Sequence, residues 1–290
     1  MIAMPANGQN VRKRPAVLRA LGDRDPPARV TVAGEIITLD RIVKHDSWAA
    51  TAIYRDGAGR SIICKFNRVQ PLFVVPLSWV GRTLARREAG FLRQLADVEL
   101  VPKDLGDVTA DGRRLPNAIA RTYIDGEVLL LTEKVTPKFF DELRDLLRAI
   151  HAHDIAYVDL HKRENVIVGR DGRPYLIDFQ VCFGLSRRWP GNGRLARFAL
   201  KRLQEIDDYH VNKHHARCLP ETLTSEEHAR YLEPPPWIRT HRKIGVPLRT
   251  LRRRLLVLLG VRREGGSATS ELEPEEAYRS PGADGSKKAD

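Results

Sequence analysis

Two aspartates, Asp159 and Asp178, follow apolar stretches of the chain, where a carboxylate is costly unless it performs a task. Asp159 comes directly after the run 155–158, and Asp178 comes directly after 175–177. Asn165 lies between them and brings a third oxygen-bearing side chain. Carboxylate and amide oxygens suit hard cations such as Mg²⁺ that are bound together with phosphate. These residue types therefore predict metal-assisted chemistry on a phosphate group.

The sequence between these side chains predicts a β-hairpin that gathers them at one site. Two short runs rich in β-branched and aromatic residues, 166–168 and 175–177, flank the turn Asp171-Gly172. Such a hairpin holds Asn165 at its entry and Asp178 at its exit. The loop that precedes the hairpin carries Asp159, so the three oxygen-bearing side chains are expected to face one site.

The stretch from Asp159 to Phe179 resembles the catalytic loop and metal-binding segment of the protein-kinase-like superfamily. The matching motifs are D-L-H-x-x-x-N, which begins at Asp159, and I-D-F, which contains Asp178. The resemblance implies that Asp159 is the catalytic base and that Asn165 and Asp178 bind Mg²⁺ beside ATP. The alternative is a purely structural role, in which Asp159 caps a helix and Asp178 belongs to a turn.

Departures from the superfamily pattern refine this resemblance. Tyr157-Val158 replaces the usual His-Arg pair, Gln180 replaces the glycine, and the loop from Asp159 to Asn165 is one residue longer. His161 stands where protein kinases usually carry lysine. In this respect the chain is similar to the small-molecule and lipopolysaccharide-sugar kinases of the superfamily.

A lysine and a glutamate upstream predict a buried ion pair. The run 61–66 predicts a strand that places Lys65 on one face, and residues 82–98 predict a helix whose apolar stripe includes Glu88. Each charge needs a partner on such a face. The resemblance implies that Lys65, fixed by Glu88, holds the ATP phosphates. The alternatives are a lysine that reaches solvent along its apolar stem and a half-exposed glutamate.

The remaining nucleotide contacts are expected in two segments. The turn after the predicted strand 36–43 contains no glycine, unlike the usual phosphate-covering loop, and there Lys44 and Ser47 are the candidate phosphate contacts. The strand that begins at Ala118 resembles the hinge, where the backbone of Tyr123 and Ile124 would bind adenine. The missing glycines keep open a non-catalytic, kinase-like binding module.

Composition points to an anionic partner and to no membrane-spanning helix. The 290 residues carry a formal net charge of +12, which suits a nucleotide, a phospholipid surface, a nucleic acid or an acidic substrate. No apolar run approaches the roughly 18 residues of a transmembrane helix, and the N-terminus lacks the pattern of a secretory signal. Three scattered cysteines predict reduced thiols in a cytoplasmic protein.

The resemblance implies an α+β, bilobal protein-kinase-like fold. A small antiparallel β lobe with one helix is expected over 31–124, and a larger, mainly helical lobe that contains the catalytic loop over 125–236. A core helix is expected over 139–150 and an amphipathic helix over 195–209. A histidine-rich cluster follows and predicts a solvated basic face more than a metal site; it comprises His210, Lys213, His214, His215 and Arg217.

Three further segments lie outside the two lobes. Residues 1–30 are basic and rich in proline, which predicts a flexible arm, and residues 264–290 have a composition typical of disorder. Residues 237–263 contain no acidic side chain and alternate arginines with leucines. This pattern is typical of an amphipathic helix on an anionic membrane. A final helix docked on the larger lobe explains the pattern equally well.

The resemblance implies transfer of the γ-phosphoryl group of ATP to a hydroxyl, with Mg²⁺. The favoured acceptor is a sugar of a lipopolysaccharide-like glycolipid at the cytoplasmic face of the inner membrane. The alternatives are a serine/threonine protein kinase, a non-catalytic binding module and an RNA- or ribosome-associated kinase; nucleic acid is the less favoured partner. The protein is expected to be a cytoplasmic monomer, peripheral on the membrane through 237–263.

Overall fold

The structure, a computed structural model, describes residues 15–72, 75–130, 135–185 and 192–236. The predicted basic helix over 237–263, the predicted disordered tail over 264–290 and the first part of the predicted arm lie outside the described residues. Within them, no helix is long and apolar enough to cross a membrane.

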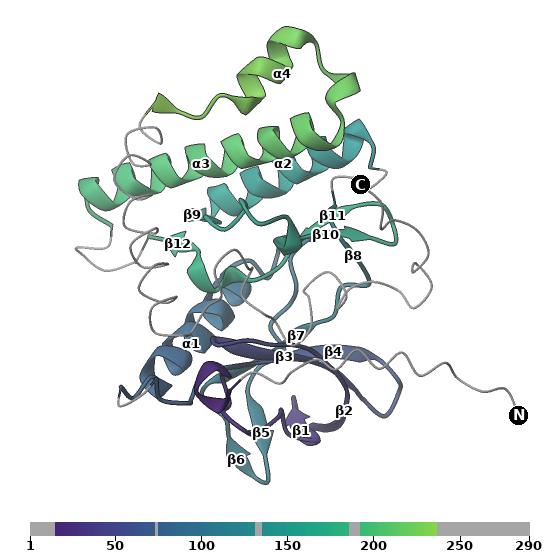
Figure 1. Cartoon of the computed structure of the whole chain (residues 1–290), viewed down its shortest axis with the longest axis vertical. Coiled ribbons are helices and arrows are strands. Elements are labelled where there is room, and N and C mark those ends of the chain that lie inside the picture. The colour runs from purple at the N-terminus through teal and green to yellow at the C-terminus, as the bar shows by residue number, and fades with distance from the viewer. Residues whose placement is uncertain (1–14, 73–74, 131–134, 186–191, 237–290) are drawn as a thin grey trace, which may run out of the picture.

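The small lobe is an antiparallel sheet with one long helix packed against it (Figure 1). The strand order is β6-β5-β1-β2-β3-β4-β7. The strands are β1 (Arg29–Val32), β2 (Glu35–His45), β3 (Ala49–Arg55), β4 (Ser61–Asn67), β5 (Val108–Ala110), β6 (Arg113–Arg114) and β7 (Ala118–Thr122), and the helix is α1 (Ser78–Gln94). Helix α1 contacts β4 and β7 at one edge of the sheet. The predicted strands over 36–43 and 61–66 are thereby confirmed.

Part of the predicted flexible arm belongs to the folded small lobe, so that prediction is wrong for residues 15–30. Ala20 and Leu21 are buried. The buried side chain of Arg68 donates hydrogen bonds to the carbonyl oxygens of Val17 and Ser47, each at 2.7 Å. The basic, proline-rich composition of this segment predicted flexibility, but a few apolar residues in it pack on the sheet. The stabilisation gained by burying them orders the segment.

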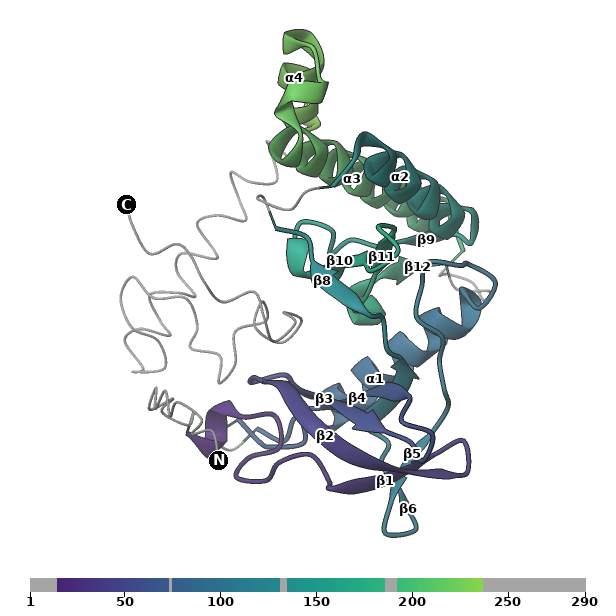
Figure 2. The same ribbon diagram turned by 90° about the vertical axis from the view of Figure 1, so that its right-hand side faces the viewer.

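In the described part of the larger lobe, two long helices cover two small sheets, and a shorter helix packs on the outer side of the second (Figures 1 and 2). The helices are α2 (Pro137–Ala152), α3 (Arg194–Cys218) and α4 (Ser225–Leu232), and the strands are β8 (Gly126–Val128), β9 (Ile155–Ala156), β10 (Val166–Gly169), β11 (Pro174–Leu176) and β12 (Phe183–Gly184). The predicted core helix is α2, whose apolar stripe is buried. The predicted hairpin is β10 and β11, with Val166 paired to Leu176. The bilobal fold class predicted from the sequence is confirmed.

Helix α3 is longer than predicted and includes the histidine-rich cluster. His214 and His215 are buried, so the expectation of a solvated basic face is wrong for these two side chains. The imidazole of His214 bonds the carbonyl oxygen of Leu160 at 2.7 Å, and the ring of His215 stacks on Phe140. Burial lowers the pKa of His214 to about 4, so the ring is neutral near pH 7. The cluster is thus partly core.

Candidate functional site

Three ionised side chains from three elements meet between the lobes. The ammonium nitrogen of Lys65, on β4, lies 2.9 Å from Oε2 of Glu88, on α1, and 2.8 Å from Oδ1 of Asp178, after β11. The Lys65 and Glu88 side chains are 8% and 1% exposed, and that of Asp178 is 25% exposed. The predicted lysine–glutamate pair is therefore present, and it extends to the aspartate that was predicted to bind metal.

The shared lysine controls the charge of the two carboxylates. Burial alone would lower the pKa of Lys65, but the charges of Asp178 and Glu88 outweigh burial and raise it. Burial would raise the pKa of Asp178, and the ammonium group of Lys65 instead holds that pKa below its usual value. For Glu88, burial outweighs the attraction of Lys65 and its pKa is raised. Asp178 is thus the more secure anion of the pair.

The backbone at Asp178 turns sharply and directs the carboxylate back to Lys65. Its φ and ψ angles are 65° and 69°, in the left-handed region, where aspartate is tolerated better than most residues. The preceding amide, of Ile177, donates to the carbonyl oxygen of Asn165 at 3.0 Å. The hairpin therefore holds Asn165 and Asp178 side by side, as the sequence predicted.

Asp159 lies in a loop beside this hairpin and is almost fully buried. Its Oδ2 accepts hydrogen bonds from the amide nitrogen of Asn165 at 3.0 Å and from the ammonium of Lys162 at 2.8 Å. The Asn165 amide also donates to the backbone carbonyl of Asp159 at 3.2 Å. These bonds leave Oδ1 of Asn165, the atom that can bind a cation, outside the loop's own hydrogen bonds.

Lys162 is a site residue that sequence reasoning missed. The resemblance gave the lysine position to His161, which lies 3.4 Å from Oδ1 of Asp159, while Lys162 lies closer to that carboxylate. The extra residue in the loop moves the lysine one place along the chain. That loop length, already visible in the sequence, was the available signal. The chain thus keeps a lysine beside the predicted base. His161 therefore no longer favours the sugar kinases over the protein kinases.

Asp207 is a second residue that was missed. It is fully buried on α3, and its carboxylate accepts the backbone amides of Tyr157 and Val158, each at 2.7 Å, and bonds the imidazole of His151 at 3.2 Å. Val158 has a φ of 70°, a strained value for a β-branched residue. Asp207 therefore fixes the strained backbone that leads into Asp159. Its seven-residue spacing from the buried Leu200 and His214 would have placed it on the inner face of α3.

The turn between β2 and β3 satisfies its own polar groups. The carboxylate of Asp46 accepts the amides of Trp48 at 2.7 Å and Ala49 at 2.9 Å, and it pairs with the ammonium of Lys44 at 3.0 Å. The hydroxyl of Ser47 donates to the carbonyl oxygen of Leu18 at 2.9 Å. In this structure an internal carboxylate occupies the amides that a phosphate would need.

The other predicted nucleotide contacts lie on the sheet face that carries Lys65 and in the connection between the lobes. Lys44 pairs in register with Thr51, and Thr51 with Lys65, so both lysines lie on one face of the sheet. Tyr123 packs against the small cluster that contains Ile63, and Ile124 against the cluster of β8 and β10. Tyr123 and Ile124 connect β7 to β8, and therefore the two lobes.

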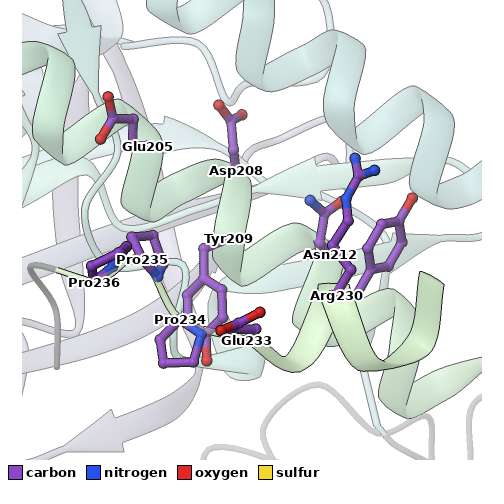
Figure 3. A pocket seen from close by; sticks show the side chains of 10 residues that line it. Glu205, Asp208, Tyr209, Asn212, Arg230, Glu233, Pro234, Pro235 and Pro236 are labelled. Atoms are coloured by element: carbon purple, nitrogen blue, oxygen red, sulfur yellow. The ribbon is translucent and has the colours of Figure 1, made fainter. Parts of the chain in front are cut away.

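A pocket of about 470 Å³ lies elsewhere, on the outer side of α3 (Figure 3). Glu205, Asp208, Tyr209 and Asn212 line it from α3, and the segment from Arg230 to Pro236 lines it from the other side. None of the predicted site residues lines this pocket.

The chain has a bilobal, protein-kinase-like fold, and a sheet lysine, a helix glutamate and a hairpin aspartate are in contact between its lobes. No family model matches the chain, and no curated protein matches it by sequence. Among solved structures, the chain is similar to the Rio2 kinase-ADP/Mg²⁺-phosphoaspartate complex from Chaetomium thermophilum, with 15% identity, a TM-score of 0.47 and coverage of 68% of this chain and 58% of that one.

The chain is also similar to Rio2 kinase from the same organism, with 14% identity, a TM-score of 0.46 and coverage of 73% of this chain and 60% of that one. In both comparisons the chain spans less than two thirds of the length of the matched protein.

Proposed function

We propose that the protein transfers the γ-phosphoryl group of ATP to a hydroxyl acceptor. The observation that carries this proposal is the position of Lys65, held between Glu88 and Asp178, with Asp178 at the end of the hairpin whose entry residue Asn165 bonds Asp159. A lysine fixed in this way can bind nucleotide phosphates, and Asp159 can orient an acceptor hydroxyl and take its proton. Such a reaction depends on positioning and on neutralising charge more than on covalent chemistry by the protein.

The site fits a magnesium ion that arrives with the nucleotide. Asp178 keeps its charge beside Lys65, and Asn165 presents an amide oxygen at the entry of the same hairpin. Within the described residues, no group of three or more histidine, cysteine, aspartate or glutamate side chains could hold a metal alone. Magnesium commonly takes one or two protein oxygens together with substrate phosphates. Bound there, the ion would neutralise charge on the transferred group.

The acceptor proposed from the sequence is a sugar hydroxyl of a lipopolysaccharide-like glycolipid, reached from the cytoplasmic face of a membrane. Two features support this acceptor: the basic character of the chain and the predicted helix over 237–263. His161 no longer supports it, because Lys162 takes the lysine position beside Asp159. A serine or threonine of a protein is the alternative acceptor, and a lysine beside the base is compatible with it.

A non-catalytic binding module is the second candidate function. The specific observation that favours it is the β2–β3 turn, where Asp46 already occupies the amides of Trp48 and Ala49. A nucleotide would have to displace this carboxylate or bind without those amides. The two candidates differ in turnover, not in nucleotide binding.

The deciding experiment measures transfer of label from γ-labelled ATP with Mg²⁺ to a panel of glycolipid, peptide and RNA acceptors. We expect Asp159→Asn and Asp178→Asn each to lower transfer by orders of magnitude, because each removes a charge that the site needs. Asp145→Asn, on the exposed face of α2 in a surface pair with Arg148, is the matched control and should retain wild-type turnover. Nucleotide binding by wild type with transfer no higher than the background seen in Asp178→Asn would favour the binding module.

A further inference from the structure

The end of the small lobe where α1 begins exposes apolar and basic side chains together. We call it the α1 entry surface and define it by Trp48, Val75, Trp79, Arg82 and Arg86. Trp79 is 60% exposed, Val75 53% and Trp48 46%; among the described residues these are three of eight exposed large apolar side chains. Both arginines are exposed. Large apolar side chains gathered at one end of a domain indicate an interaction site.

The chain is folded tightly at this surface. Leu72 and Val75 exchange two backbone hydrogen bonds of 3.0 Å, which defines a tight turn. The amide of Arg68 donates to the carbonyl oxygen of Trp48 at 2.8 Å, so the β2–β3 turn lies at the same end of the sheet.

The two arginines of this surface have no acidic partner among the described residues. Glu88 is the only acidic residue of α1 and is buried against Lys65. Arg82 and Arg86, four residues apart on the helix, repel one another. The structure shows no hydrogen bond or ion pair for either guanidinium within the described residues. The N-cap residue of α1, Leu77, provides no side-chain hydrogen bond to the helix. An anionic partner would remove each of these penalties.

The combination of tryptophan, valine and arginine side chains fits an anionic lipid surface better than a nucleic acid. Tryptophan favours the membrane–water interface, where its ring is buried and its N–H remains near water. Arginines attract anionic headgroups, and small aliphatic side chains such as Val75 enter the acyl boundary. A nucleic-acid surface would use the tryptophans for stacking but has no role for an apolar turn with Val75 and Pro76.

We propose that the α1 entry surface docks the small lobe on a membrane that contains anionic phospholipid. The exposed apolar side chains insert at the interface, and Arg82 and Arg86 bind the headgroups. Docking there brings the β2–β3 turn, and with it the row of Lys44, Thr51 and Lys65, toward the lipid surface. The proposal does not depend on phosphoryl transfer, because its test measures binding alone.

The test is co-sedimentation of the full chain with neutral vesicles of phosphatidylcholine and with vesicles that also contain phosphatidylglycerol. Wild type should bind only the anionic vesicles, and salt should weaken the binding. Arg82→Glu/Arg86→Glu should lower the partition coefficient at least about 30-fold, since each basic residue near an anionic surface is worth roughly one kcal/mol. Trp79→Ser should lower it without changing the dependence on salt.

Arg113→Glu/Arg114→Glu is the matched control, because it makes the same charge change on β6, at the opposite edge of the sheet from α1. It should bind as wild type does. Urea unfolding of Arg82→Glu/Arg86→Glu beside wild type separates loss of binding from loss of the fold: equal free energies of unfolding would assign the loss to the removed charges.

Three results would overturn the proposal. In the first, Arg82→Glu/Arg86→Glu binds anionic vesicles as wild type does. In the second, only Arg252→Glu/Arg253→Glu/Arg254→Glu abolishes binding, which would assign the contact to 237–263. In the third, vesicles do not sediment the protein, while RNA binds it and loses affinity when Arg82 and Arg86 are replaced.

Discussion

At the scale of single residues, the site depends on one cation shared by two anions. Lys65 contacts Glu88 and Asp178 with two hydrogen bonds of 2.9 and 2.8 Å. Oε1 of Glu88 is buried with no hydrogen-bond partner among the described residues. The arrangement is therefore balanced only while the lysine is present, and removal of its charge leaves two carboxylates in a poorly solvated place.

This balance gives a prediction for Lys65→Met. Breaking a buried ion pair by removing one partner typically costs about 3–5 kcal/mol, so the free energy of unfolding should fall by about that amount at pH 7–8. The loss should shrink as the pH is lowered, because Glu88, whose pKa burial already raises, then takes a proton and no longer needs the lysine. Urea unfolding at several pH values measures both effects.

The double variant Lys65→Met/Glu88→Gln is the control for this interpretation. It removes the second charge and should recover part of the lost stability at pH 7–8, with a weaker dependence on pH. An equal loss in the single and double variants at every pH would contradict the shared-cation account.

Sequence reasoning identified most of the site residues because their chemistry is local. Lys65, Glu88, Asp159, Asn165 and Asp178 each stand out as a charge or amide in an apolar pattern. Lys162 and Asp207 were missed for different reasons. The first depends on where one extra loop residue is accommodated, and the second on a helix from a distant part of the chain that bonds the backbone before Asp159. The sequence shows the longer loop and the helical spacing, but it does not show which lysine reaches Asp159 or which backbone amides Asp207 meets.

At the scale of elements, α1 must lie close to β4 for Glu88 to reach Lys65. Gly81 permits this approach, because a Cβ atom added there would lie 2.1 Å from the carbonyl oxygen of Arg68. Gly90, on the same helix, has open space in the direction of its absent side chain. Two glycines of one helix therefore have different roles.

We predict opposite effects for alanine at these two positions. Gly81→Ala should destabilise the protein by at least about 1–3 kcal/mol through overpacking, and it should weaken nucleotide binding as α1 shifts. Gly90→Ala should stabilise it by about 0.5–1 kcal/mol, because alanine restricts the unfolded chain and favours the helix. Thermal unfolding of the two variants beside wild type provides the measurement. Similar melting temperatures for both variants would show that α1 does not depend on this close approach.

The elements themselves were predictable to different degrees. The hairpin β10–β11 and the helix α2 follow from short-range patterns, and both were confirmed. Helix α3 was predicted to end at Tyr209, but it continues to Cys218 because His214 and His215 pack into the core. The packing of residues 15–28 could not be predicted from local sequence. Their few apolar residues are buried only because strands from later in the chain form the surface against which they pack.

At the scale of the whole molecule, the buried His214 couples stability to pH. Its ring bonds the carbonyl oxygen of Leu160, next to Asp159, and burial lowers its pKa from 6.5 to about 4. The unfolded chain therefore binds the proton more readily, and the contribution of His214 to stability is complete above pH 6.5 and is lost as the pH falls toward 4. This group can remove about 3 kcal/mol at most over that range.

The prediction is a difference between two proteins, because other groups also titrate there. Wild type should lose more stability between pH 6.5 and pH 4 than His214→Asn, whose side chain cannot take up the proton. Chemical denaturation at a series of pH values measures the two slopes. Identical slopes would mean that His214 is already accessible to protons in the folded state.

The central claim is that Lys65, Asp159, Asn165 and Asp178 form one nucleotide and metal site. A crystal structure of the full chain with Mg²⁺ and a non-hydrolysable ATP analogue tests it most directly. We predict that the ammonium of Lys65 contacts the nucleotide phosphates while Glu88 still contacts it, that Asp178 and Asn165 bind the metal, and that Asp159 faces the terminal phosphate. A nucleotide bound elsewhere, with Lys65 directed to bulk solvent, would contradict the account.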